Sequence, residues 1–147
     1  MLSFFKRNKF PPKSIRVNRM EEYHTHYLGK YEDGKMFWGD PAFITKSNGE
    51  RIDYAVLYLF DKLGHLENYK HHKFVNPENP ENIWHKIDEY VKELDDVELC
   101  DIKIELFSVE IDGFNFGLRA DDENKMIHLD PQSSISFEKP WNGEYYT

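Results

Sequence analysis

Cysteine is the scarcest of the chemically reactive residues in this 147-residue chain, with Cys100 as its only example. One thiol cannot form an internal disulfide, so nothing in the sequence indicates an oxidising compartment. It also cannot supply the several thiolates of a cysteine-based zinc site. Because Cys100 adjoins Ile102 at the start of an expected strand, we interpret it as a small apolar core residue rather than a nucleophile.

Long apolar runs and glycine-rich loops are also missing. No segment approaches the roughly 20 apolar residues that span a bilayer, and the first ten residues lack the apolar stretch of a signal peptide. The expected location is therefore the cytoplasm. The glycines are isolated, so no phosphate-binding loop is present, and no serine lies in a Gly-x-Ser-x-Gly elbow. We expect no catalytic residue and no cofactor.

Charge is distributed unevenly along the chain. The net charge is −8, yet residues 1–20 contain six Lys or Arg and no acid, which leaves −14 on residues 21–147. Such an acidic body repels phosphates, so no nucleic-acid partner is expected. We interpret residues 1–20 as a basic N-terminal arm, either a solvated tail or an edge segment. Phe4 and Phe5 among its cations leave a weak contact with an anionic membrane surface as an alternative.

Aromatic residues are plentiful, with eleven Phe, nine Tyr and three Trp. Rings bury a large area per residue, so this composition indicates an aromatic-rich core and a folded chain. The length suits one domain, which we place at residues 21–147.

The first half of that domain has the pattern of an antiparallel meander. Asp33-Gly34 is a strong hairpin signal between two apolar segments. Pro41, inside the second segment, indicates an edge position or a bulge. The third segment is apolar on both faces, which is typical of the centre of a sheet. The four expected strands are 23–28, 36–44, 52–61 and 65–75.

One amphipathic helix is expected at residues 80–94. Ile83, Ile87 and Val91 recur on one face. Asn79 is placed to cap this helix, with Pro80 at its first position.

Short strands return after the helix, including a second hairpin at Asp112-Gly113. The sequence therefore predicts an α+β domain with the element order ββββαββββ. Its mainly antiparallel sheet would have about eight strands, with one long helix packed on one face.

Seven histidines raise the possibility of a metal site. His24 and His26 lie two apart in an expected strand, so their side chains would share one face, and His71 and His72 could add ligands. No spacing matches a known zinc pattern, and the expected metal content is therefore none. A metal-dependent enzyme remains a third hypothesis for this chain.

Four aromatic residues are candidates for contact with a partner protein. Large rings anchor many protein interfaces, and a tail with several rings is expected to pack on the body. The candidates are Trp38, Trp141, Tyr145 and Tyr146.

Several short motifs are distributed along residues 36–147. They are Phe37-Trp38-Gly39, Tyr54-Ala-Val-Leu-Tyr-Leu-Phe-Asp61 with Gly64, Asp101-Ile102, Phe107-Ser-Val109, Asp112-Gly113, Phe116-Gly117-Leu118 and Pro140-Trp-Asn-Gly-Glu-Tyr-Tyr-Thr147. In these motifs the chain resembles a family of small bacterial proteins labelled formate hydrogenlyase regulatory protein (HycA-like). The resemblance implies regulation of formate hydrogenlyase expression, and it supplies no catalytic residue.

Two main hypotheses of function follow. The first is a non-enzymatic regulatory or interaction protein that acts by contact with another protein. The alternative is an immunity-type protein that neutralises a toxin, because an acidic body could mimic phosphate toward a basic nuclease.

Overall fold

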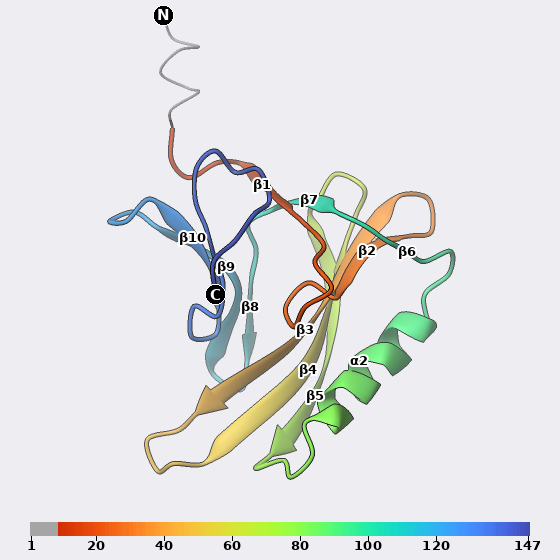
Figure 1. Ribbon diagram of the computed structural model, residues 1–147, viewed down its shortest axis with the longest axis vertical. Helices are drawn as coiled ribbons and strands as arrows, with labels where there is room; N and C mark the ends of the chain where they lie inside the picture. The colour runs from red at the N-terminus through yellow and green to blue at the C-terminus, as the bar shows by residue number, and fades with distance from the viewer. Residues whose placement is uncertain (1–8) are drawn as a thin grey trace, which may run out of the picture.

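The computed structural model describes residues 9–147, which form three antiparallel sheets and one α-helix (Figure 1). The largest sheet has five strands in the order β5-β4-β3-β2-β6. Four of them are consecutive hairpin partners, which confirms the expected meander. The five strands are β2 (Tyr27–Tyr31), β3 (Lys35–Thr45), β4 (Arg51–Phe60), β5 (Leu66–Val75) and β6 (Glu98–Leu99).

The second sheet has four strands in the order β11-β10-β9-β8. Asp112 and Gly113 connect β8 to β9 with φ angles of 53° and 83°, which suits a tight hairpin turn and confirms the second expected hairpin. Tyr146 extends this sheet through an isolated bridge to Ser136. The strands are β8 (Ser108–Ile111), β9 (Phe114–Asp121), β10 (Met126–Asp130) and β11 (Ser136–Phe137).

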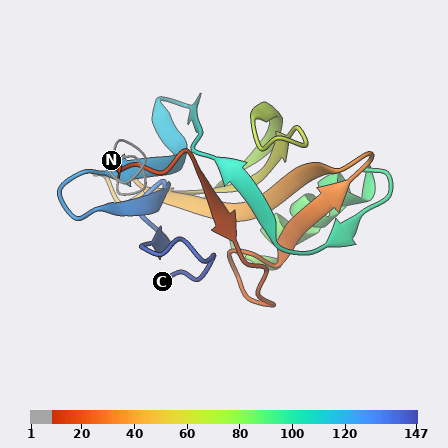
Figure 2. The same cartoon turned by 90° about the horizontal axis from the view of Figure 1, so that it is seen from above.

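A two-stranded ribbon joins β1 (Ser14–Val17) to β7 (Ile102–Glu105), and Figure 2 shows the two strands side by side. Ile15 and Val17 of β1 are buried in the main core. Residues 14–17 of the expected arm thus belong to the folded body. Residues 1–8, which include the arm's Phe4 and Phe5, lie outside the described residues.

The helix α2 (Glu81–Lys92) lies between β5 and β6 in the chain. Its buried residues are Ile83, Ile87 and Val91, which confirms the expected apolar face. Pro80 occupies the cap position that was expected for Asn79, so the helix begins one residue later, at Glu81. The side chain of Asn79 still accepts a hydrogen bond from the backbone N–H of Glu81 at 3.0 Å. No helix within residues 9–147 has the length and apolar character needed to cross a membrane.

Alternation of side chains along β4 divides the molecule into layers. In β4, Tyr54, Val56 and Tyr58 face the core shared with the second sheet. Ala55 and Leu57 face the opposite way, into a smaller core under α2. Figure 1 shows the same arrangement, with α2 and the strands β8–β10 on opposite sides of the five-stranded sheet. The apolar character of both faces of β4 is thereby explained.

Pro41 lies inside β3, opposite Ala55 of β4. On the other side of β3, pairing with β2 stops at Gly39, which faces Tyr27. Pro41 therefore lies in a part of β3 that has a strand partner on one side only. This confirms the expected edge position of Pro41, where no strand needs the backbone N–H that proline lacks.

The α+β class is confirmed, but the expected single sheet of about eight strands is wrong. The described residues contain eleven strands in three sheets. Residues 102–111 form two separate strands, because β7 pairs with β1 while β8 pairs with β9. A change of pairing partner along the segment starts a new sheet.

Candidate functional site

The four candidate metal-ligating histidines lie apart in the structure. The expectation that His24 and His26 lie in a strand at 23–28 and share one face is wrong, because both are in the loop before β2. His24 is buried there and His26 is half-buried. His71 and His72 are adjacent residues of β5 and are both exposed. Within residues 9–147, no three His, Cys, Asp or Glu side chains are grouped to hold a metal ion.

The four candidate contact residues have very different exposure. Trp38 is 0% exposed and is a core residue, so it presents no surface to a partner. Trp141 is half-buried and packs beside Phe10, with ring centroids 6.0 Å apart. Tyr145 is half-buried and its hydroxyl lies 2.7 Å from Thr25 Oγ1. Tyr146 is 56% exposed and is the one candidate whose ring is mostly in solvent.

A different set of rings surrounds a surface cavity of about 330 Å³ beside α2. The ring of Trp84, on α2, is the common neighbour of the other three rings. The ring centroids of Tyr23, His26 and Tyr27 lie 5.7, 6.0 and 5.9 Å from the Trp84 centroid. Tyr23 is 42% exposed, so the cavity opens to solvent. We call this site the aromatic pocket, and it is lined by Glu21, Glu22, Tyr23, His26, Tyr27 and Trp84.

Gly39 allows α2 to lie close enough to the sheet for Trp84 to reach Tyr27. A Cβ atom on Gly39 would meet Cγ2 of Ile87 at 2.6 Å and Cβ of Tyr27 at 3.1 Å. These distances are shorter than ordinary van der Waals contact, so a side chain at position 39 would push the helix outward. The absent side chain therefore sets the spacing between α2 and β2.

A hydrogen bond fixes the same spacing at the surface. The Tyr27 hydroxyl donates to Oδ1 of Asp88 at 2.9 Å, and Lys92 lies 2.8 Å from the other oxygen of that carboxylate. Burial and the Asp88 hydrogen bond raise the pKa of Tyr27 to about 12. Lys92 and Tyr27 lower the pKa of Asp88. The carboxylate therefore stays ionised and keeps the phenol protonated at neutral pH.

The rim of the aromatic pocket is acidic. Glu21 and Glu22 are exposed, and of the described residues that line the pocket none is Lys or Arg. Arg19 lies beside the pocket, where its guanidinium is 3.9 Å from Glu21 and donates to the carbonyl of His26 at 3.1 Å. The pocket thus combines negative ring faces with two carboxylates.

A buried hydrogen bond between His24 and Asp40 supports the loop that carries these rings. Nδ1 of His24 lies 3.1 Å from Oδ1 of Asp40, whose side chain is 1% exposed. The indole N–H of Trp38 donates to the His24 carbonyl at 2.7 Å, and the His24 ring packs against Tyr23 with centroids 4.5 Å apart. The core residues Asp40 and Trp38 therefore fix the position of His24, and His24 in turn supports the ring of Tyr23.

Asp40 should make stability depend on pH. Burial raises the pKa of its carboxyl, and the hydrogen bond with His24 opposes this only in part. Protonated Asp40 contributes fully to stability below the ordinary aspartate pKa of about 3.9. This contribution is lost as pH rises through the higher pKa that Asp40 has in the folded protein. We expect Asp40→Asn to gain stability relative to the wild type as pH rises from about 4 to about 8.

The measurement is urea denaturation of both proteins across that range. Asp33→Asn, at an exposed residue in the turn before β3, is the matched control for loss of one surface carboxylate. A difference between Asp40→Asn and the wild type that stays constant with pH would contradict the prediction.

Comparisons of the chain with models of protein families, with curated proteins and with solved structures find no match in any of the three. The grounds for a function are therefore the side chains themselves. The aromatic pocket brings four rings together with two carboxylates, and no Lys or Arg is among its described lining residues.

Proposed function

We propose that this chain is a non-enzymatic protein-binding domain whose aromatic pocket holds a cationic side chain from a basic segment of another protein. One observation carries the proposal: four rings and two carboxylates line one open cavity that has no Lys or Arg among its described lining residues. Regulation of formate hydrogenlyase expression, implied by the family resemblance, would then proceed by protein contact.

The physical argument is the attraction between a cation and the negative face of an aromatic ring. This attraction is strongest for tryptophan and reaches about 2 kcal/mol when the cation is desolvated. Trp84 is half-buried at the centre of the site, and Glu21 and Glu22 add favourable charge at the rim. A neutral or anionic side chain would gain neither contribution.

The pocket is preorganised, which lowers the cost of binding. Gly39 and the Tyr27–Asp88 hydrogen bond fix the helix against the sheet, and the His24–Asp40 pair fixes the loop. A partner would therefore meet rings whose positions are already set.

The test compares a peptide of alternating Arg and Gly with its citrulline counterpart, which has the same shape without the charge. Binding to the full chain is measured by isothermal titration calorimetry. We expect the Arg peptide to bind about tenfold more tightly than the citrulline peptide, and Trp84→Ala to remove about tenfold of that affinity.

Trp141→Ala is the matched control, because Trp141 is another half-buried tryptophan and does not line the pocket. Its affinity for the Arg peptide should equal that of the wild type. Equal binding of the Arg and citrulline peptides would refute the cationic guest. Loss of binding in Trp141→Ala with retention in Trp84→Ala would place the contact on the C-terminal tail.

An immunity-type role is the second candidate, and the acidic rim of the pocket favours it. A toxin that acts on nucleic acid carries basic surface, which would suit the same carboxylates. The two candidates predict different properties of the partner. If the chain is an immunity-type protein, its partner is a nuclease, and adding the purified chain abolishes the nuclease activity. If the chain is a regulatory protein, its partner has no nuclease activity.

A further inference from the structure

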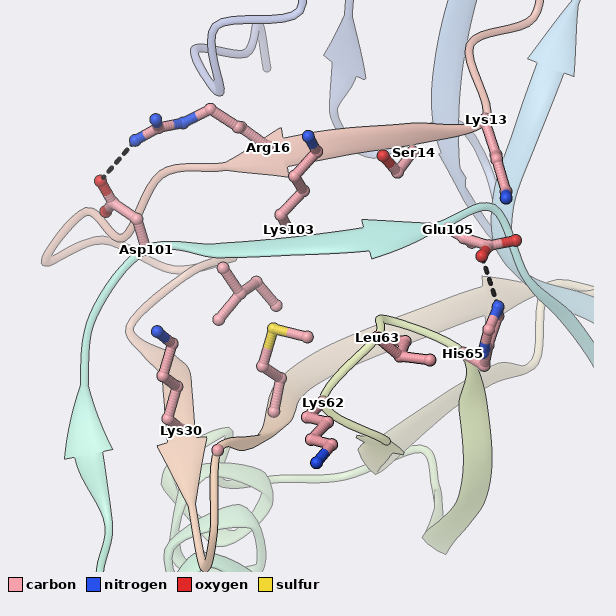
Figure 3. A pocket seen from close by; sticks show the side chains of 13 residues that line it. Lys13, Ser14, Arg16, Lys30, Lys62, Leu63, His65, Asp101, Lys103 and Glu105 are labelled. Atoms are coloured by element: carbon pink, nitrogen blue, oxygen red, sulfur yellow. Dashed lines mark ion pairs between the residues drawn. The ribbon is translucent and has the colours of Figure 1, made fainter.

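A second and larger cavity, of about 750 Å³, lies on another part of the molecule. One wall is the β1–β7 ribbon, and the other is formed by β2 and the turn between β4 and β5 (Figure 3). Five of its lining residues are Lys or Arg, and we call it the basic cleft. They are Lys13, Arg16, Lys30, Lys62 and Lys103.

The carboxylates that line the basic cleft are already paired. Asp101 lies 3.6 Å from the Arg16 guanidinium and accepts the backbone N–H of Arg19 at 2.8 Å. Glu105 forms an ion pair with His65. The four lysines of the cleft, by contrast, form no ion pair with any residue that the structure describes.

This concentration of positive charge runs against the composition of the chain. The net charge is −8, yet the cleft has five cationic and two anionic lining residues, with the His65 ring bonded to one of the acids. Four lysines and Arg16 line one cavity, and their summed positive potential attracts an anion. The cleft therefore favours a ligand with several negative charges.

The walls of the cleft are held together by backbone contact. Gly64, in the turn between β4 and β5, accepts a hydrogen bond from the Glu105 N–H at 3.0 Å. A Cβ atom on Gly64 would meet the Lys103 carbonyl oxygen at 2.9 Å, and its φ of 94° also favours glycine. This close approach brings Lys62 and Lys103, which are far apart in sequence, to the same cavity.

Apolar side chains lie between the cations. Met36 and Ile102 contribute to the lining, and Leu63 stands at the edge with a side chain that is 70% exposed. Contact of an apolar or aromatic group with Leu63 would remove apolar surface from water, which is favourable. The lining as a whole thus suits a molecule with both an anionic and an apolar part.

We propose that the basic cleft binds a phosphorylated organic molecule, with its phosphates between Lys30 and Lys103 and its organic part against Leu63 and Met36. Phosphate groups carry more charge per group than carboxylates and accept several hydrogen bonds from lysine. This site is separate from the aromatic pocket and does not depend on the proposed function.

The experiment measures the affinity of the full chain for two probes, ATP and inorganic tripolyphosphate, by isothermal titration calorimetry. ATP should bind more tightly than tripolyphosphate, because both have three phosphates and only ATP carries an organic part for Leu63. Lys30→Gln combined with Lys103→Gln should weaken ATP binding about tenfold or more, and should reduce its dependence on salt concentration.

The matched control combines Lys46→Gln with Lys139→Gln, two exposed lysines outside the cleft, and should bind ATP as the wild type does. Thermal unfolding of every variant checks that the fold is retained. The proposal is overturned by absence of binding to both probes at millimolar concentration, or by equal loss in the cleft and control variants. Tighter binding of a poly-glutamate peptide than of ATP would also overturn it, since the site would then be one for acidic protein segments.

Discussion

Gly117→Ala should lower the free energy of unfolding by at least about 3 kcal/mol. Gly117 has a φ of 128°, which side chains of L residues rarely adopt. A Cβ atom there would also overlap the carbonyl oxygen of Phe107. That oxygen accepts the N–H of Leu118 at 2.9 Å, so it cannot move without loss of a backbone hydrogen bond.

The position of Gly117 in the sheet makes relief of this overlap difficult. It pairs with Ser108 on one side and Asp130 on the other. A shift of β9 would therefore disturb both neighbouring strands. The measurement is urea denaturation, with loss of the folded state as the extreme outcome.

Gly49→Ala separates the two causes of the effect. Gly49 has a φ of 87°, but no heavy atom lies within 4 Å of the place that a Cβ would take, so only backbone strain is added there. We expect this control to lose about 1 kcal/mol. Equal losses at positions 49 and 117 would show that the overlap with Phe107 contributes nothing.

Trp38→Ala should lower the free energy of unfolding by about 3–5 kcal/mol. The side chain is 0% exposed, lies on β3 and belongs to the main core. Its removal leaves a cavity and leaves the His24 carbonyl without the indole donor that lies 2.7 Å away. The measurement is again urea denaturation, and Trp141→Ala should cost less because Trp141 is half-buried.

Trp38→Phe distinguishes packing from hydrogen bonding. Phenylalanine refills most of the cavity but cannot donate to the His24 carbonyl. We expect an intermediate loss of about 1–3 kcal/mol, together with faster amide hydrogen exchange in residues 22–26 because the loop has lost its anchor. A protein that keeps wild-type exchange in that loop would contradict this role for the indole N–H.

Local signals in the sequence predicted the meander, the helix and both hairpins. Each depends on neighbours in the chain: the alternation in 52–61, the 3.6-residue repeat of Ile83 and Ile87, and the Asp-Gly turns. The partition into three sheets could not be predicted in this way. Ile15 and Val17 alternate with polar residues as a strand should, but only their pairing with Ile104 and Ile102 shows that they are buried.

The aromatic pocket was missed for a related reason. Tyr23, His26 and Tyr27 are close in sequence and follow two glutamates, which is a visible signal. Their contact with Trp84 depends on the distance between α2 and the sheet. That distance is short because Gly39 has no side chain. The basic cleft likewise combines lysines from four separate segments, so no local pattern contains it.

The pairing of β1 with β7 has a consequence for synthesis of the protein. On the ribosome, Ile15 and Val17 emerge long before Ile102 and Ile104, the residues that they face in the ribbon. At translation rates of about 5–20 residues per second, the nascent strand waits roughly ten seconds for its partner. Lys13, Arg16 and Arg19 surround these two apolar residues, and their mutual repulsion discourages association between neighbouring nascent chains during that interval.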